Sequence, residues 1–264
     1  MYVLAFFSLS FIFHHSFMRA QLEKYAREYE TASFINGDPS WFMHQVEGAH
    51  NREATAFVAS ALSYGSRKQF MPKIQAILDD ACGDVDKWLR ERRFEHRFKA
   101  GDSRSFYRLY SFSAMNRFFA TYADLLAEYG TLGAYVRGRA TDGFEAVEAI
   151  TDYFRSHGSG GVVPKDATSA CKRICMFLRW MVRSSSPVDL GLWADFIDRR
   201  TLLIPLDTHV LQEAQRLGLI KSRTASMSAC RRLTTRLAEI FPDDPLRGDF
   251  ALFGYGVDNS HAQI

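Results

Sequence analysis

Apolar residues recur at helical spacing along almost the whole chain of 264 residues, and this periodicity constrains the fold more than any other feature. The segment at 70–81 has apolar residues at i, i+4, i+7 and i+8, and the segment at 228–240 carries a similar stripe. We find no segment with the alternation of Val, Ile and Thr that is typical of strands. The pattern predicts an all-α protein. We expect two helices over residues 105–127, an exposed helical stretch around Trp88 and Phe94, and a short helix at 191–197.

One break in composition interrupts the helical pattern, the His-Gly-Ser-Gly-Gly sequence at 157–161. Such a run is typical of a short flexible link. We expect a single helical unit over residues 18–264, and the link is compatible with two lobes, 18–157 and 162–264, with a cleft between them. A hydrophobic content of 47% and a charged content of 24% exclude a disordered or collagen-like chain.

Residues 1–17 form an apolar stretch without Lys, Arg, Asp or Glu. Three interpretations are open: translation begins at Met18, the stretch is a signal or anchor, or it is a structured part of the fold. The stretch lacks a positive first region and a small-residue cleavage motif, and two His residues interrupt it. We favour a start at Met18, which predicts a cytoplasmic protein without membrane association.

The cysteines do not form a metal-binding pattern. None belongs to a C-x-x-C pair, and two of them lie four residues apart on one predicted helix. This usage is typical of a reducing compartment, and we expect neither a metal cluster nor another cofactor. The four residues are Cys82, Cys171, Cys175 and Cys230.

The segment at 165–183 concentrates positive charge. It has five basic residues and one acidic residue, a net charge of +4 in a chain whose total is +3. Lys172, Arg179 and Arg183 follow at i, i+7 and i+11, so they form one polar stripe on a predicted helix at 169–183. One interpretation is that the arginines pair with carboxylates. Candidate partners are Asp189, Asp195 and Asp198.

The other interpretation of this stripe is an edge that faces an anion. Burial and neighbouring positive charge would both favour the neutral amine of Lys172, and a neutral amine is a nucleophile. A second polar element follows at 203–210, where Pro205 precedes Asp207 at a predicted helix N-cap. Asp207 either only satisfies helix amides or, held ionised by them, faces a developing positive charge.

The Pro-Leu-Asp-Thr-His-Val sequence at 205–210, followed by a helix, by Arg-Leu-Gly-Leu and by two more helices, resembles the helix-hairpin-helix DNA glycosylase superfamily. In its endonuclease III-like members the Asp of this element is catalytic, and lyases carry a catalytic Lys near the start of the preceding helix. The resemblance implies catalytic roles for Asp207 and Lys172. It also implies a two-lobed helical fold, DNA as the partner, and base-excision repair by cleavage of an N-glycosidic bond.

The run at 51–70 is similar to the first core helix of these enzymes and to the following turn, which reaches into the DNA or the base pocket. From this resemblance we expect further residues to bind DNA or the extruded base, with plain packing as the alternative for each. The candidates are Tyr64, Arg67, Arg179, Trp180, Arg183, Trp193 and His209.

The chain also departs from the glycosylase pattern. The residues at 166–171, before Lys172, contain no glycine, whereas the family has a Gly-x-Gly turn there whose amides bind a DNA phosphate. A more specific resemblance is to a bacterial family of unknown function that shares the segments at 172–183, 205–210 and 249–256. The alternative function is a non-catalytic helical module that binds nucleic acid or protein.

Overall fold

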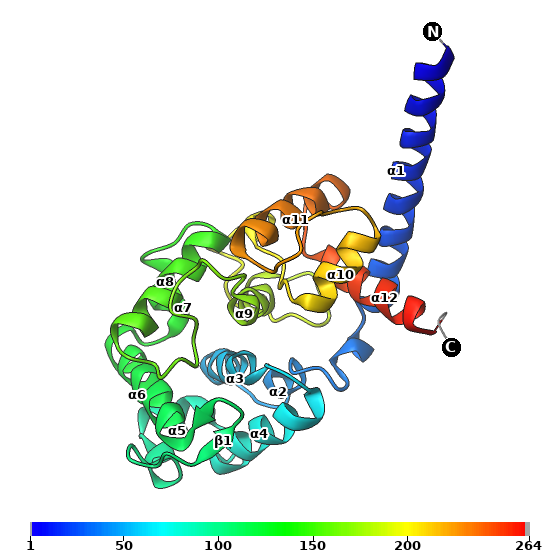
Figure 1. The fold of residues 1–264 in the computed structure, drawn as a ribbon. Helices are drawn as coiled ribbons and strands as arrows, with labels where there is room; N and C mark the ends of the chain where they lie inside the picture. Colours follow the sequence, from blue (N-terminus) through cyan, green and yellow to red (C-terminus); the bar gives the residue numbers. More distant parts are fainter. Residues whose placement is uncertain (1, 262–264) are drawn as a thin grey trace.

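The computed structural model describes residues 2–261, and within them the side chains of 16–257. Helices account for 60% of the residues and strands for 3%, so the predicted all-α class is confirmed (Figure 1). The first half of the chain contains α1 (Tyr2–Tyr29), α2 (Trp41–His44), α3 (Ala49–Leu62), α4 (Arg67–Asp80), α5 (Val85–Arg90), β1 (Ser105–Tyr107), β2 (Tyr110–Ser111) and α6 (Phe112–Tyr129).

The second half continues with helices on both sides of the Gly/Ser link. It contains α7 (Leu132–Arg137), α8 (Gly143–Ser156), α9 (Lys172–Val182), α10 (Thr208–Arg216), α11 (Met227–Ile240) and α12 (Arg247–His261). Short 3-10 turns lie at Ala32–Ile35, Arg93–His96 and Arg199–Thr201.

Helix α9 lies at the centre of the molecule (Figure 1). It packs against α3 and α8, which precede the link, and its residues from Ile174 to Val182 are buried. One hydrophobic cluster extends from Leu22 on α1 to Leu252 on α12, so both sides of the link contribute to the same core. The division into two lobes stays a prediction.

The C-terminal part of the N-terminal helix α1 packs against α12, and the rest of α1 projects from the molecule (Figure 1). Met18, Leu22, Tyr25 and Ala26, spaced at i, i+4, i+7 and i+8, are buried. The prediction for residues 1–17 falls mostly outside the described side chains. In the described part of the chain, no helix combines the length and the apolar character that a bilayer crossing requires.

The segment at 105–127, expected to form two helices, instead forms an antiparallel hairpin followed by the single helix α6. Tyr107 pairs with Tyr110 across a two-residue turn, and Ser111 then caps α6 by accepting a hydrogen bond from the Ala114 amide at 3.1 Å. The helical prediction was wrong for residues 105–111, because Phe and Tyr suit a short strand as well as a helix, and it was confirmed for residues 112–127.

Two further expectations were wrong. Trp88 and Phe94, expected on an exposed helix, are fully buried, and the Trp88 indole donates to Asp80 at 3.0 Å. The expected helix at 191–197 is a series of turns that folds back on α9. There the Trp193 amide donates to the Met181 carbonyl at 2.7 Å, which satisfies one of the free carbonyls at the end of α9.

A buried carboxylate joins three distant segments. Glu53 on α3 accepts hydrogen bonds from the Leu132 amide at 2.8 Å, the Gly133 amide at 3.2 Å and the Trp193 indole at 2.8 Å. Burial raises the pKa of Glu53, and these three donors oppose the rise. Glycine is required at 133, because a Cβ there would lie 2.6 Å from the indole nitrogen of Trp193.

We expect Glu53→Ala to lower the free energy of unfolding by about 2–5 kcal/mol, since it leaves three buried donors without an acceptor. Denaturant unfolding measures this loss. Glu239→Ala is the matched control, because Glu239 forms an exposed pair with Arg236, and it should change stability by less than about 1 kcal/mol. Equal effects of the two variants would contradict the structural role of Glu53.

Candidate functional site

The structure brings the two predicted catalytic residues into direct contact. Lys172 Nζ lies 2.8 Å from Asp207 Oδ2. The side chains are 37% and 28% exposed, respectively, so the pair lies at an edge that solvent reaches. Lys172 is the first residue of α9 and Asp207 immediately precedes α10, so two helix N-termini converge on this point.

Helix α11 positions the backbone on both sides of this pair. The Met227 amide donates to the Thr168 carbonyl at 3.2 Å, and Ser226 forms an isolated bridge with Ser169 just before α9. Cys171 follows with a φ of 44°, a left-handed conformation that costs a non-glycine residue of the order of 1–3 kcal/mol. This strained residue turns the chain directly into Lys172.

The segment that leads to Asp207 is held by the same helix. Residues 202–206 have no regular secondary structure and are buried. The Ile204 amide donates to Thr234 Oγ1 at 3.0 Å, and Cys230 Sγ donates to the Ile204 carbonyl at 3.0 Å. Thr234 and Cys230 both belong to α11. This helix therefore holds the segment before Asp207 as well as the segment before Lys172.

Asp207 acts as the N-cap of α10, as the sequence predicted. Its Oδ1 accepts a hydrogen bond from the Val210 amide at 2.9 Å, while Oδ2 contacts Lys172. Burial opposes ionisation, but the Lys172 ammonium, the Val210 amide and the charge of His209 outweigh it and lower the pKa of Asp207. The carboxylate is therefore ionised at neutral pH.

Arg179 and Arg183, predicted to bind DNA, lie inside the protein and pair with carboxylates. Their side chains are 4% and 1% exposed. Arg179 contacts Asp189 at 3.3 Å and also Asp249, whereas Arg183 contacts Asp189, Asp244 at 2.8 Å and Glu30. The stripe on α9 is therefore mostly an internal ion-pair network, and only its Lys172 end reaches solvent.

In this network, burial and the neighbouring opposite charges shift the pKa of each group in opposite directions. Burial opposes the charge on Arg183, but Asp189, Asp244 and Glu30 outweigh it and raise the pKa. Burial raises the pKa of Asp189 and of Asp249, and the arginines oppose that rise. Asp249 also interacts electrostatically with Asp207 and Lys172. The charges of the exposed pair therefore affect the pKa of a carboxylate in the buried network.

The other predicted binding residues divide into buried and exposed groups. Trp180 and Trp193 are buried in the core. Tyr64 is 41% exposed, His209 is exposed beside Asp207, and Arg67 pairs with Asp38 at 3.4 Å. The tryptophans therefore pack rather than line a surface, whereas Tyr64, His209 and Arg67 are accessible to a ligand.

Sequence reasoning missed two polar residues near the pair, Arg173 and Asp249. Arg173 follows Lys172 in the same basic segment, and Asp249 belongs to the final aromatic helix whose motif was already noted. The concentration of charge at 165–183 was a usable signal for Arg173. The pairing of Asp249 with Arg179, 70 residues away, had no local signal.

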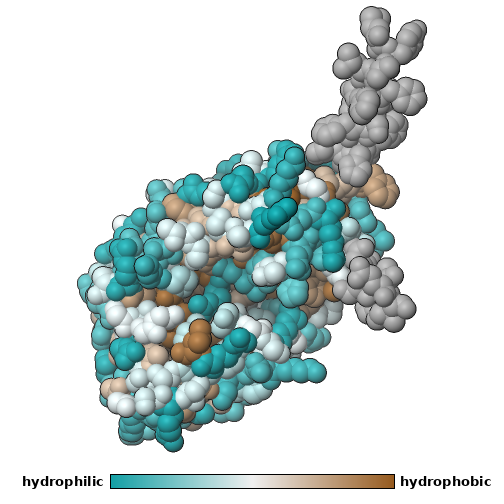
Figure 2. All heavy atoms as spheres, in the orientation of Figure 1, coloured by the Kyte–Doolittle hydropathy of each residue, from teal (hydrophilic) through white to brown (hydrophobic). Residues whose placement is uncertain are grey.

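A groove of about 560 Å³ lies along α10, and its lining includes Thr208, Lys221 and Arg223. Thr208 follows Asp207 directly in the sequence, but neither Asp207 nor Lys172 lines the groove. Neither Lys221 nor Arg223 has an ion-pair partner among the described residues, so the groove is positive. Hydrophilic side chains cover much of the face in view (Figure 2).

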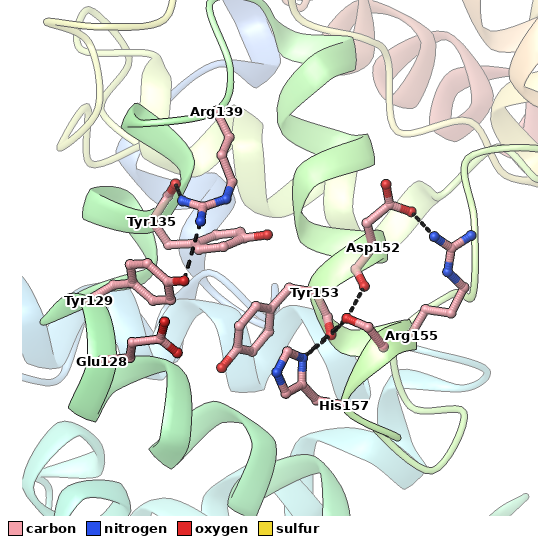
Figure 3. Close-up of a pocket in the computed structure, with 9 residues that line it drawn as sticks. Glu128, Tyr129, Tyr135, Arg139, Asp152, Tyr153, Arg155 and His157 are labelled. Atoms are coloured by element: carbon pink, nitrogen blue, oxygen red, sulfur yellow. Dashed lines mark hydrogen bonds and ion pairs between the residues drawn. The ribbon is translucent and has the colours of Figure 1, made fainter.

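A second concave region, of about 340 Å³, lies between α6, α7 and α8 (Figure 3). The rings of Tyr129, Tyr135 and Tyr153 meet edge to face there, with centroids 5.0–6.3 Å apart. Arg139 lies over Tyr135, 4.1 Å from its centroid, and donates to the Tyr129 hydroxyl at 3.2 Å. Because Arg139 already occupies the ring faces, we assign this region no part in the chemistry.

The described residues contain no group of three or more His, Cys, Asp or Glu side chains suited to a metal ion. The four cysteines are free, and three of them are buried. Hydrogen bonding with Cys230 and burial raise the pKa of the Cys175 thiol well above the ordinary value. The three buried thiols are packing residues of the core rather than exposed thiolates.

Comparison with known proteins identifies the family. Residues 38–258 match the model of a family described as "Protein of unknown function (DUF2400)". The chain belongs to the DUF2400 family. The predicted membership of an uncharacterised conserved family is thus confirmed, and the matched region includes both Lys172 and Asp207.

No curated protein and no solved structure matches this DUF2400 chain. The resemblance to helix-hairpin-helix DNA glycosylases therefore stays a prediction, as does the DNA partner.

We expect Asp189→Ala to lower the free energy of unfolding by about 3–5 kcal/mol, because it leaves Arg179 and Arg183 short of a buried carboxylate. Calorimetry or denaturant unfolding measures the change. The matched control is Asp152→Ala, which breaks an exposed pair with Arg155 and should cost less than about 1 kcal/mol. A small effect of Asp189→Ala would show that the network does not stabilise the fold.

Two substitutions at Asp207 separate its charge from its capping role. Asn retains a side-chain oxygen for the Val210 amide but loses the ion pair, so Asp207→Asn should cost about 0.2–1 kcal/mol at neutral pH. Asp207→Ala also loses the cap, a further loss of about 1 kcal/mol.

The pH dependence of Asp207→Asn follows from the lowered pKa of Asp207. The contribution of the carboxylate to stability is complete above its unfolded-state pKa and is lost as pH falls through the lower folded-state value. The stability difference between wild type and Asp207→Asn should therefore shrink in acid. A difference that is constant from neutral pH into strong acid would contradict the ionised pair.

Proposed function

We propose that this DUF2400 protein is a base-excision DNA glycosylase with abasic-site lyase activity, in which Lys172 is the nucleophile and Asp207 stabilises the developing positive charge. The observation that carries the proposal is the 2.8 Å contact between Lys172 Nζ and Asp207 Oδ2 at a solvent-accessible edge. The resemblance assigned a role to each residue separately, and the two lie 35 positions apart in the sequence.

The proposed chemistry uses both groups in turn. As the N-glycosidic bond breaks, its electron pair leaves with the base and positive charge develops at C1′, which the fixed Asp207 carboxylate stabilises. Lys172 Nζ then bonds to C1′, and ring opening gives a Schiff base. This imine favours loss of a C2′ proton and elimination of the 3′ phosphate, which cleaves the strand.

Lys172 must lose a proton before its nitrogen can attack. The nearest acceptor is Asp207 Oδ2, with which the ammonium already shares a contact. Asp207 stays ionised while the bond to the base breaks, because its charge is needed at that step. Once the base has left, Lys172 gives its proton to Asp207 as its nitrogen bonds to C1′, so the carboxylate becomes neutral only at the attack.

A nucleic-acid substrate also agrees with the charge around the pair. The buried arginines of α9 are neutralised by carboxylates, which leaves Lys165 and Arg173 of the basic segment without an ion-pair partner among the described residues. Lys221 and Arg223 line the groove along α10. Positive charge of this kind neutralises phosphates and releases their counterions. His209, exposed beside Asp207, is a further donor for a phosphate.

We expect borohydride to trap the wild-type protein on a duplex that contains an abasic site, because reduction makes the Schiff base permanent. Lys172→Ala should abolish trapping. Asp207→Asn should slow the release of a damaged base by about 10²–10³-fold, the range typical of a lost electrostatic stabiliser. Gel electrophoresis of the trapped complex and a panel of damaged-base duplexes provide the measurements.

Lys165→Ala is the matched control, because it removes an exposed lysine from the same basic segment and should trap like wild type. Trapping by Lys172→Ala at the wild-type level would exclude Lys172 as the nucleophile. If wild type neither forms the adduct nor releases any base but still binds DNA, the non-catalytic nucleic-acid-binding alternative is favoured.

A further inference from the structure

Two arginines contact the ring of the exposed Tyr64. The guanidinium carbon of Arg108 lies 4.8 Å from the ring centroid, and that of Arg173 lies 5.9 Å from it. Arg108 comes from the turn between β1 and β2, whereas Arg173 belongs to the first turn of α9. Within the described residues, neither guanidinium has a carboxylate at ion-pair distance, in contrast to Arg179 and Arg183.

The turn that carries Arg108 is built for this position. Arg108 has a φ of 50°, which is unfavourable for a residue with a Cβ. Gly65 leaves the space that its guanidinium occupies, since a Cβ at 65 would lie 2.3 Å from Arg108 Nη1. The Tyr107 hydroxyl donates to the Tyr64 carbonyl and so ties the hairpin to the end of α3. The protein thus holds a strained arginine against Tyr64.

Arg173 is fixed by neutral partners only. Its Nη1 donates to the Tyr110 hydroxyl at 2.7 Å and to the Ala61 carbonyl. These contacts orient the guanidinium but leave its positive charge uncompensated, and most of its five N–H donors stay available. Two oriented cations that share one aromatic ring repel each other, and a bound anion would remove that repulsion.

We propose that Arg108, Arg173 and Tyr64 form a binding site for one phosphodiester of the nucleic acid that enters the Lys172–Asp207 site. This inference rests on the proposed function. Guanidinium groups match the geometry of phosphate oxygens and bind them through paired hydrogen bonds. Arg173 follows Lys172 directly, so the proposed phosphate ligand and the proposed nucleophile both belong to the first turn of α9.

The proposed phosphate site would take the place of a glycine turn, which the chain lacks before α9. The residues at 166–171 contain no glycine, so the chain before α9 lacks the glycine-rich backbone that commonly approaches phosphates closely. Side-chain guanidiniums would supply the positioning contact in its place. A phosphate contact fixes the register of the bound strand but carries no sequence information.

The test is equilibrium binding of a fluorescent duplex that contains a tetrahydrofuran abasic analogue, which cannot form a Schiff base. Fluorescence anisotropy at several KCl concentrations gives the slope of log K against log [salt]. We expect Arg108→Gln to weaken binding and to reduce the slope by about 1, the change for one lost phosphate contact. Because Arg108 is exposed, this variant should fold normally.

Arg232→Gln is the matched control, because it removes one exposed arginine from α11, at the opposite end of the molecule from β1 (Figure 1). It should bind with the wild-type slope. Arg173→Gln should behave like Arg108→Gln, and circular dichroism checks its fold because Arg173 is half-buried.

If Arg108→Gln keeps the wild-type affinity and slope while wild type traps abasic DNA, the phosphate site is wrong and the proposed function stands. If wild type binds no duplex even at low salt, both are overturned. A loss of affinity equal to that of Arg232→Gln would also overturn the site, because it would reflect net charge alone.

Discussion

The fold depends on the ion pairs that surround the buried end of α9. Arg179 and Arg183 enter the interior on the central helix and meet four carboxylates there, one from the loop that follows α9 and three from distant parts of the chain. Each charge alone would be costly to bury, so the segments that carry the carboxylates must pack against α9 together. The carboxylates are Glu30, Asp189, Asp244 and Asp249. These ion pairs position three segments against α9: the end of the N-terminal helix, the loop after α9 and the start of α12.

The cations of the stripe on α9 differ in their exposure to solvent along the helix. Its inner members are buried and neutralised, whereas Lys172 at the outer end shares a partly exposed contact with Asp207. The inner network keeps the helix from shifting, and α11 sets the backbone on either side of the pair. A buried ion-pair network thus supports a partly exposed ion pair, and the proposed chemistry would use this fixed geometry as preorganised electrostatics.

Periodicity was sufficient to predict the helical class and most helices from α3 onward, because each helix buries one regular stripe. It failed for β1 and β2, whose aromatic residues suit either structure, and it misplaced Trp88 because charged neighbours masked a buried ring. The stripe on α9 and its pairing with Asp189 were both among the predictions.

The remainder of the site depended on contacts between residues far apart in the sequence. Arg183 meets Asp244 and Glu30 across 61 and 153 positions, respectively, and no local pattern encodes such pairings. Tyr64 was a candidate from its position after α3, but its contact with Arg108 required the hairpin that the sequence interpretation had replaced with a helix.

The role of α11 has a consequence for the order in which the site forms during synthesis of the chain. Lys172 and Asp207 are synthesised well before the segment that holds their backbones, which ends at Ile240. During translation the nascent chain therefore carries an isolated lysine and an isolated aspartate that nothing yet brings together. The Lys172–Asp207 pair can be held as described only after residues 226–240 have emerged and folded, so its geometry depends on a later part of the chain.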